Sequence, residues 1–334
     1  MPANIGEMFY TEATPWHGLG IHLAEPATVE EALKVGGLNW KVAEIDMLTA
    51  DDPPSPIARR KALVRVDRPP GHPGRVVGVV HREFTPIQNS DAALLFDAIF
   101  GHGGRFYHTG GYLGDGEVIW LLARINKMLR VGRDDIVEPY ALMANSHDGS
   151  MAFSIRLTTI RVVCQNTLAL AMHERIGQSF RRSHDGSLSQ HAEAAQEFFK
   201  ATLKEFDFVA EAFTALSARV CREDVFRTII EGLLPEPKKP RNADRSPGVL
   251  RAWERRVTDI RAARAKILEL RMNGKGAEVD GARGTYWGAL NAVLEYVDHH
   301  HVSNGSALSY ALLGDGMDLK VRAFRMIRET AKAA

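Results

Sequence analysis

Hydrophobic and polar residues alternate with a period of two along much of the chain up to about residue 163, a pattern typical of strands with one face in a core. The last such segment is the clearest, because Met151, Phe153, Ile155 and Leu157 alternate with small or polar residues and predict a half-buried strand. The predicted strands are Trp40–Leu48, Ala62–Val66, Arg75–Arg82, Arg105–Leu113, Glu117–Ile125, Ile136–Asn145 and Met151–Val163.

Turn-forming residues separate these strands. Gly114-Asp115-Gly116 can supply the positive φ of a tight hairpin, and Asp148-Gly149 is the strongest short hairpin signal in the chain. Proline cannot donate a ladder hydrogen bond, so Ala50–Pro56 and Pro69–Pro73 are predicted to be loops. One helix, Asp91–Phe100 with Ser90 as its N-cap, is predicted between the strands.

From Cys164 onward the pattern becomes helical. The longest candidate, Gln190–Leu233, has a continuous apolar stripe that needs a partner surface, and its length predicts a homo-oligomer. The stripe consists of Ala195, Phe199, Thr202, Phe206, Val209, Phe213, Leu216 and Val220. Further helices are predicted at Val249–Met272, Gly284–His301 and Met317–Ala331.

This order of elements predicts an α+β fold, because strands and helices do not alternate regularly. We expect a mainly antiparallel β core with one crossing helix in residues 1–190, packed on a long helix. Residues 191–334 are expected to form a helical region that packs on this core. Its segment 234–247 holds four prolines and four bases and is predicted to be an exposed loop.

Charge is segregated along the chain, although the formal net charge is only +1. Residues 1–58 carry two bases and nine acids, 2 − 9 = −7, whereas residues 235–275 carry twelve bases and five acids, 12 − 5 = +7. Two readings are open: the two regions pair with each other or are solvated, or the basic region binds a polyanion.

The composition also indicates the cellular compartment in which the protein is expected. Two cysteines do not make a disulfide scaffold, so a reducing cytoplasm is the expected location. No apolar run approaches the roughly 20 residues of a membrane span, and the N-terminus lacks the features of a signal peptide.

Familiar catalytic patterns are weak in this chain. No phosphate-binding loop or dinucleotide fingerprint occurs, so no ATP-driven motor and no cofactor are expected. Adjacent histidines on a helix point about 100° apart, so His299-His300-His301 is not expected to hold one metal ion. Ser146 or Ser150 beside His147 is better explained as a hairpin turn than as a nucleophile, and Cys164 as a packing residue.

Several motifs together carry a resemblance. They are Pro15-Trp16-His17-Gly18-Leu19-Gly20, N-S-H-D-G-S at Asn145–Ser150, L-T-T-I-R-V-V-C-Q-N-T at Leu157–Thr167, and the segment Gly284–His301. This set resembles a family of phage- and plasmid-encoded proteins, domain of unknown function 932. The resemblance implies a place in mobile genetic elements and names no reaction.

The order of elements is also similar to that of the single-strand annealing proteins of phage recombination and of the eukaryotic recombination mediator. That similarity implies a ring that holds DNA in a basic groove without ATP. We therefore expect a DNA-binding protein, with single strands favoured, that acts in annealing and recombination.

The cations expected to contact phosphates are Arg156, Arg161, Arg181, Arg182, Lys238, Lys239, Arg241, Arg245, Arg251, Arg255 and Arg256. Aromatic faces for base stacking could come from Phe106, Tyr107, Tyr112 and Tyr140. Two alternatives stay open. One is a metal-dependent enzyme acting on nucleic acid through His17, His147 and Asp148; the other is a non-enzymatic host-defence antagonist whose acidic N-terminal region mimics DNA.

Cys164 is expected to be inert. Cys164→Ser should lower the melting temperature and leave DNA binding unchanged, because the thiol is expected to pack rather than react. Thermal denaturation together with a DNA titration checks this. Loss of binding at an unchanged melting temperature would instead assign the thiol a chemical role.

Overall fold

The computed structural model describes residues 4–11, 19–100, 104–161, 167–169, 180–182, 209–241, 246–301 and 315–334. The chain forms two compact units. Unit 1 comprises Met1–Asn126, Pro139–Thr158 and His173–Glu205, and unit 2 comprises Lys127–Glu138, Thr159–Met172 and Phe206–Ala334. The boundary predicted near residue 190 lies outside the described residues and stays a prediction.

The larger sheet has the strand order β11-β10-β9-β7-β6-β1-β2, and β12 pairs with β10 and β8 with β9. Its strands are β1 (Ile5–Thr11), β2 (Ile21–Leu23), β6 (Tyr107–Leu113), β7 (Val118–Arg124), β8 (Leu129–Val131), β9 (Asp135–Ser146), β10 (Phe153–Arg161), β11 (Thr167–Ala169) and β12 (Phe180–Arg182). The pairs β1–β6, β6–β7 and β7–β9 are antiparallel as expected, whereas β1 and β2 run parallel.

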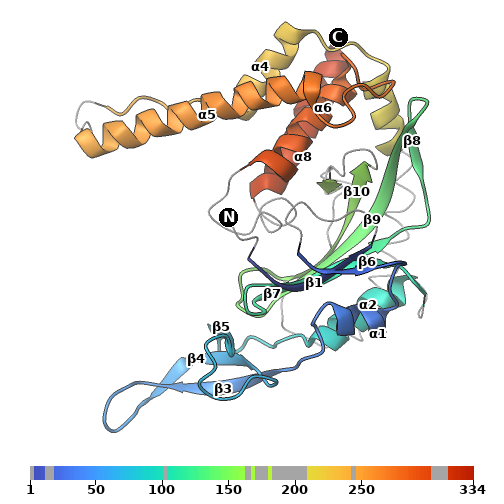
Figure 1. The fold of residues 1–334 in the computed structure, drawn as a ribbon. Coiled ribbons are helices and arrows are strands. Elements are labelled where there is room, and N and C mark those ends of the chain that lie inside the picture. The colour runs from blue at the N-terminus through green and yellow to red at the C-terminus, as the bar shows by residue number, and fades with distance from the viewer. Residues whose placement is uncertain are drawn as a thin grey trace. The chain divides into compact units, whose positions relative to one another are not determined.

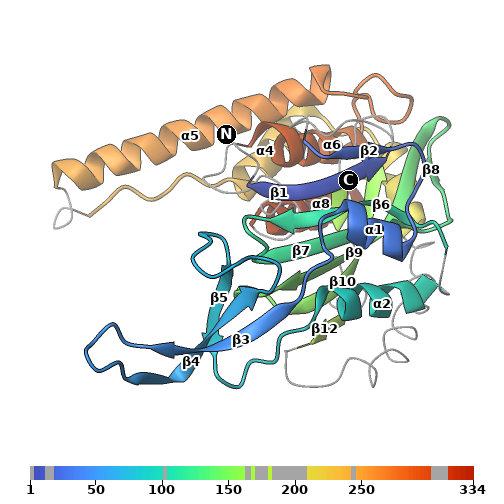
Figure 2. The ribbon, with the colours of Figure 1, turned by 60° about the horizontal axis from the view of Figure 1, so that its bottom comes forward.

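Two helices of unit 1, α1 (Val29–Val35) and α2 (Asn89–Phe100), lie on one face of this sheet (Figures 1 and 2). Helix α1 begins with a capping box, in which Thr28 and Glu31 each accept the other's backbone N–H. Helix α2 begins earlier than predicted, because the Gln88 carbonyl already accepts a helical hydrogen bond from Ala92. Ser90 is therefore inside the helix, and its prediction as N-cap was wrong.

A second sheet, β3-β4-β5, forms a twisted wing in unit 1 (Figure 1). Its strands are β3 (Val42–Leu48), β4 (Pro56–Arg65) and β5 (Val76–His81), joined in antiparallel register. A Cβ added at Gly78 in β5 would lie 2.2 Å from the His147 carbonyl oxygen. Only glycine allows the wing to approach the β9–β10 turn this closely.

Unit 2 contains the helices of the C-terminal part. They are the helical segment 209–217, α4 (Glu223–Leu233), α5 (Pro247–Asn273), α6 (Tyr286–Glu295), a π-helical turn (Tyr296–His300) and α8 (Asp315–Ala333). Every residue of α6 is buried, and α6 contacts both α5 and α8. Phe213 packs on Trp287 and Phe324, with ring centroids 4.7 and 5.9 Å apart, so these rings form the centre of this core.

The fold class is the predicted one, α+β with N-terminal sheets and a helical C-terminal part. Two predictions about periodic segments were wrong. The helix predicted over Gln190–Leu233 ends at 217 and a new one starts at Glu223, so Val220 is 76% exposed. Strand β10 is buried on both faces from Phe153 to Thr159, because alternating polar residues such as Ser154 and Thr158 are buried as well.

Among the described residues, no helix is both long enough and apolar enough to cross a membrane.

A buried histidine of β6 provides a test of this core. The His108 ring packs edge-on against Tyr140, and its Nδ1 lies 2.9 Å from the Thr11 hydroxyl. Burial, aided by the Arg124 charge, lowers the pKa of His108 from 6.5 to about 4.

Between pH 6.5 and about 4, His108 is protonated in the unfolded chain but stays neutral in the folded chain. The free energy of unfolding should therefore fall as the pH drops toward 4. The loss should reach up to about 2 kcal/mol at pH 5. Urea unfolding at several pH values should show a smaller loss in His108→Gln than in the wild type. The exposed His81→Gln serves as the control, and identical slopes in all three proteins would contradict the assignment.

Candidate nucleic-acid interface

The N-S-H-D-G-S motif forms the turn between β9 and β10, as predicted. Gly149 has φ +76°, and the Asp148 carboxylate accepts a hydrogen bond of 2.8 Å from the Ser150 N–H. The Ser146 hydroxyl donates to the Met151 carbonyl at 2.7 Å and accepts from the Met151 N–H at 3.1 Å. These bonds explain Ser146, Asp148 and Ser150 as turn chemistry, with no nucleophile required, whereas Asn145 belongs to β9 and donates to the Ile87 carbonyl at 3.3 Å.

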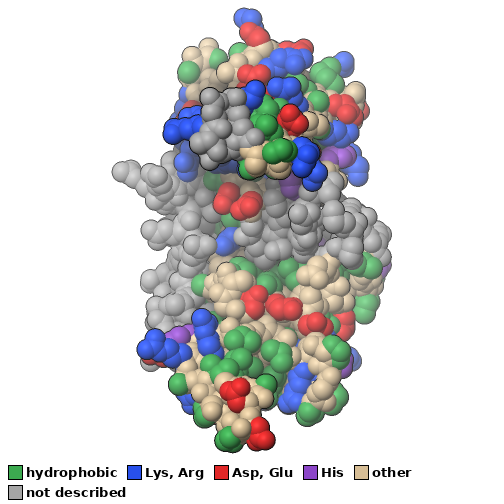
Figure 3. All heavy atoms as spheres, turned by 90° about the vertical axis from the view of Figure 1, so that its left-hand side faces the viewer, with side chains coloured by type: hydrophobic (Ala, Val, Ile, Leu, Met, Phe, Trp, Pro, Cys, Tyr) green, Lys and Arg blue, Asp and Glu red, His purple; other side chains and the backbone are tan. Residues whose placement is uncertain are grey.

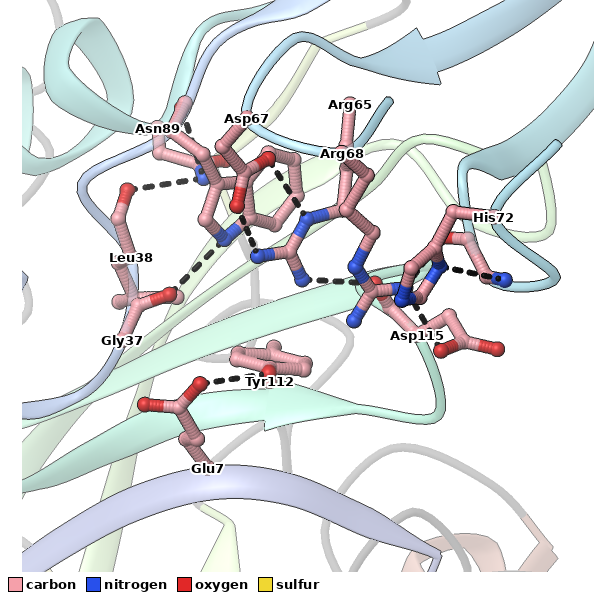
Figure 4. A network of polar contacts seen from close by, with 12 residues as sticks. Glu7, Gly37, Leu38, Arg65, Asp67, Arg68, His72, Asn89, Tyr112 and Asp115 are labelled. Atoms are coloured by element: carbon pink, nitrogen blue, oxygen red, sulfur yellow. Dashed lines mark hydrogen bonds and ion pairs between the residues drawn. The ribbon is translucent and has the colours of Figure 1, made fainter. Parts of the chain in front are cut away.

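His147 and Asn89 connect this turn to the rest of unit 1. The fully buried His147 ring has its Nε2 2.9 Å from the Asn89 Oδ1. The Asn89 amide donates in turn to the carbonyls of Leu38 and Trp40, at 3.1 and 3.4 Å (Figure 4). One amide side chain therefore joins α2, the loop before β3 and the β9–β10 turn, and we call this set the Asn89 hub.

A second group of polar contacts anchors the wing beside this hub (Figure 4). The Arg65 guanidinium lies 4.3 Å from the Trp40 ring centroid and 5.0 Å from that of Tyr112. It also donates two hydrogen bonds to Asp67, which lower the pKa of that carboxyl group. Because the cation is buried between rings and a carboxylate, its arrangement suits anchoring rather than ligand binding.

The Gly284–His301 segment also has a structural explanation. Thr285 caps α6, and a Cβ at Gly288 would lie 2.0 Å from the Ala282 carbonyl oxygen. The Trp287 indole donates a 2.7 Å hydrogen bond to Asp135.

The histidines do not assemble a metal site in the part of the chain that the structure describes, where no three His, Cys, Asp or Glu side chains could hold one ion together. Burial lowers the pKa of His301, and burial together with the Lys266 charge lowers that of His300. His17 lies outside the described residues, as do Pro15–Gly18 and Cys164.

The first half of α5 and the segment that runs beside it form what we call the basic arm, residues 234–241 and 246–261. Ser246 caps α5, and Pro247 occupies its first turn, where no N–H is needed. The Trp253 indole donates to the Pro237 carbonyl at 2.9 Å, and Arg261 makes two hydrogen bonds to Glu236. The segment thus covers one side of the helix and leaves the other side open (Figures 1 and 2).

The arm carries seven bases and three acids, 7 − 3 = +4. Six of these bases are exposed, and no carboxylate of the described residues forms an ion pair with them: Lys238, Lys239, Arg241, Arg251, Arg255 and Arg256. At 100° per residue, Arg251 and Arg255 lie on the side of the helix opposite Trp253 and Val257. Figure 3 views the molecule from the side at which α5 begins and shows several Lys and Arg side chains on this upper part, with Asp and Glu side chains among them.

The acidic N-terminal region has partners of its own inside unit 1. Glu25 and Glu31 both pair with Arg105, Glu44 pairs with Lys61, and Asp46 pairs with Arg82. Four of the nine acids are therefore already paired with three cations of the same unit. This observation favours the reading in which the basic arm meets an external anion.

The remaining predicted cations are not part of the arm. Arg156 is buried on β10, at 6% exposure. Arg161 ends β10, and the β12 register places Arg181 and Arg182 opposite Ser154 and Phe153, with their side chains outside the described residues. Arg245 also lies outside them.

The sequence profile of the family described as Domain of unknown function (DUF932) matches residues 76–331. The chain belongs to this family. The DUF932 match includes Asn89, His147 and the whole basic arm, and it leaves out the acidic region and most of the wing. No curated protein and no solved structure matches the chain.

The Asn89 hub can be tested by mutation. Asn89→Ala removes one hydrogen-bond partner of His147 and one of each of two backbone carbonyls. The loss of these buried hydrogen bonds should lower the free energy of unfolding by roughly 1–3 kcal/mol. The neighbouring Ser90→Ala, at an exposed position, should change it by less than about 0.5 kcal/mol. Urea denaturation measures both, and a stable Asn89→Ala protein would show that the hub does not hold unit 1 together.

Proposed function

We propose that this protein is a DNA-binding protein of mobile genetic elements that holds the phosphate backbone through its basic arm. The observation that carries the proposal is the set of six exposed arm cations without an ion-pair partner in the described part of the chain. Repeated cations along one element are the usual means of backbone binding, because each contact releases condensed counterions.

The process we propose is ATP-independent annealing of single strands in recombination. Two features support it: the sequence contains no nucleotide-binding motif, and the arm presents exposed cations, which can attract phosphates without ATP. Single strands would be the substrate, and Arg161, Arg181 and Arg182 near β10 and β12 remain candidates for contacting them. Annealing of complementary fluorescent strands without nucleotide is the direct assay.

The proposed site of action is the cytoplasm, as a homo-oligomer. Of the described residues of the apolar stripe that suggested oligomerisation, Val209, Phe213 and Leu216 are already buried, and Val220 is exposed but lies outside the helix. An oligomer would therefore depend on surfaces other than these three buried residues.

The salt dependence of DNA binding tests the arm. Each phosphate contact contributes about −0.7 to the slope of log K against log salt on single strands and about −0.9 on duplex, so six contacts should give roughly −4 to −5. Arg251→Gln/Arg255→Gln should flatten the slope by roughly 1.5 to 2 on the DNA form that the arm holds. Fluorescence anisotropy at several salt concentrations measures it.

A matched control is available on α4. Arg222 and Arg227 are exposed but ion-paired, with Asp224 and Glu223 at 2.8 and 2.6 Å. Arg222→Gln/Arg227→Gln changes the total charge by the same two units and should leave the slope unchanged. If both double variants changed the salt slope equally, DNA binding would depend on the net charge of the protein and not on the arm. A wild type that binds neither DNA form at low salt overturns the proposal.

A further inference from the structure

The basic arm offers a nucleic acid cations but no surface for stacking. Its one aromatic residue is Trp253, whose indole is half-buried against Pro237 and covered by the Lys239 ammonium 5.7 Å from the ring centroid. The open side of the helix, around Arg251, Arg255 and Ala262, has charged and small side chains instead. A strand laid along this side would find no aromatic ring to stack on among the described residues of the arm.

The aromatic residues predicted for stacking elsewhere are also engaged. Tyr107, Tyr112 and Tyr140 are buried, and the half-buried Phe106 packs on Phe100 with ring centroids 5.5 Å apart. Proteins that hold single strands gain about 1–3 kcal/mol for each base stacked on an aromatic side chain. The arm would bind single strands without that contribution.

Phosphate density then decides which DNA form the arm prefers. The helical part of the arm, Pro247–Arg261, is about 22 Å long at 1.5 Å per residue. Over that length a duplex presents one phosphate per about 1.7 Å, roughly 13 in all, whereas one strand of it presents half as many. An element that binds by charge alone is attracted more strongly to the denser array.

We propose that the basic arm binds double-stranded DNA, in a manner independent of base sequence. This inference rests on the proposed function and specifies it: the arm holds the duplex that annealing produces, and single strands are held elsewhere. The contacts are between guanidinium or ammonium groups and phosphate oxygens, with no covalent chemistry.

The test compares one oligonucleotide of about 30 nucleotides with its duplex, in the wild type and in Arg251→Gln/Arg255→Gln. On duplex DNA the variant should bind at least tenfold more weakly at moderate salt, with a slope flatter by about 1.8. On the single strand its affinity should stay within about twofold of the wild type. Two duplexes of unrelated sequence should lose affinity equally.

The control Arg222→Gln/Arg227→Gln should retain duplex affinity, and all variants should keep the wild-type melting temperature because the mutated residues are exposed. An equal or larger loss on the single strand overturns the duplex assignment while leaving DNA binding by the arm intact. A wild type that binds neither form overturns the proposed function itself. Unequal losses on the two duplexes would show base readout and overturn sequence independence.

Discussion

The hydrogen bonds of the Asn89 side chain are the constraint on which unit 1 depends. A fully buried imidazole and two loop carbonyls meet at one amide, and the loss of buried hydrogen bonds is costly. Satisfying them positions the start of α2, the loop before β3 and the β9–β10 turn relative to one another. The close approach of Gly78 to the His147 carbonyl then brings the wing against the same turn. The motif residues Asn145–Ser150 are thereby explained by architecture rather than by catalysis.

Charged side chains are paired differently in unit 1 and in the basic arm of unit 2. In unit 1, Arg65 is buried between two rings and Asp67, and acids of the N-terminal region pair with Arg105, Lys61 and Arg82. In the basic arm only Arg261 has such a partner among the described residues, and Arg251 and Arg255 project from the side of α5 opposite Trp253. Exposed cations on a helix that form no ion pair within the described residues can attract an external polyanion. This contrast, more than total charge, supports the proposed function.

Hydrophobic periodicity in the sequence predicted most helices and strands. Its predictions were wrong where the burial of side chains did not follow the periodic pattern. Strand β10 alternates apolar and polar residues, yet both faces are buried, since Ser154, Arg156 and Thr158 are enclosed as well. The apolar stripe through Phe213 continues to Val220 in sequence, but the helix ends at 217 and Val220 forms a bridge with Thr285 instead. The short helix α1 was missed although Thr28 and Glu31 spell a capping box, a signal the sequence does contain.

The sequence by itself determined the α+β class, most strand and helix positions, the Asp148-Gly149 turn and the basic segment, because these depend on local periodicity, turn chemistry and composition. Only the tertiary structure decided which charged residues are available. Sequence analysis made the same prediction, phosphate contact, for Arg156 and Arg251. Arg156 is buried on strand β10, whereas Arg251 is exposed on helix α5. The pairing of Glu31 with Arg105, 74 residues away, was equally invisible. Burial and pairing depend on contacts between distant segments, which no local pattern encodes.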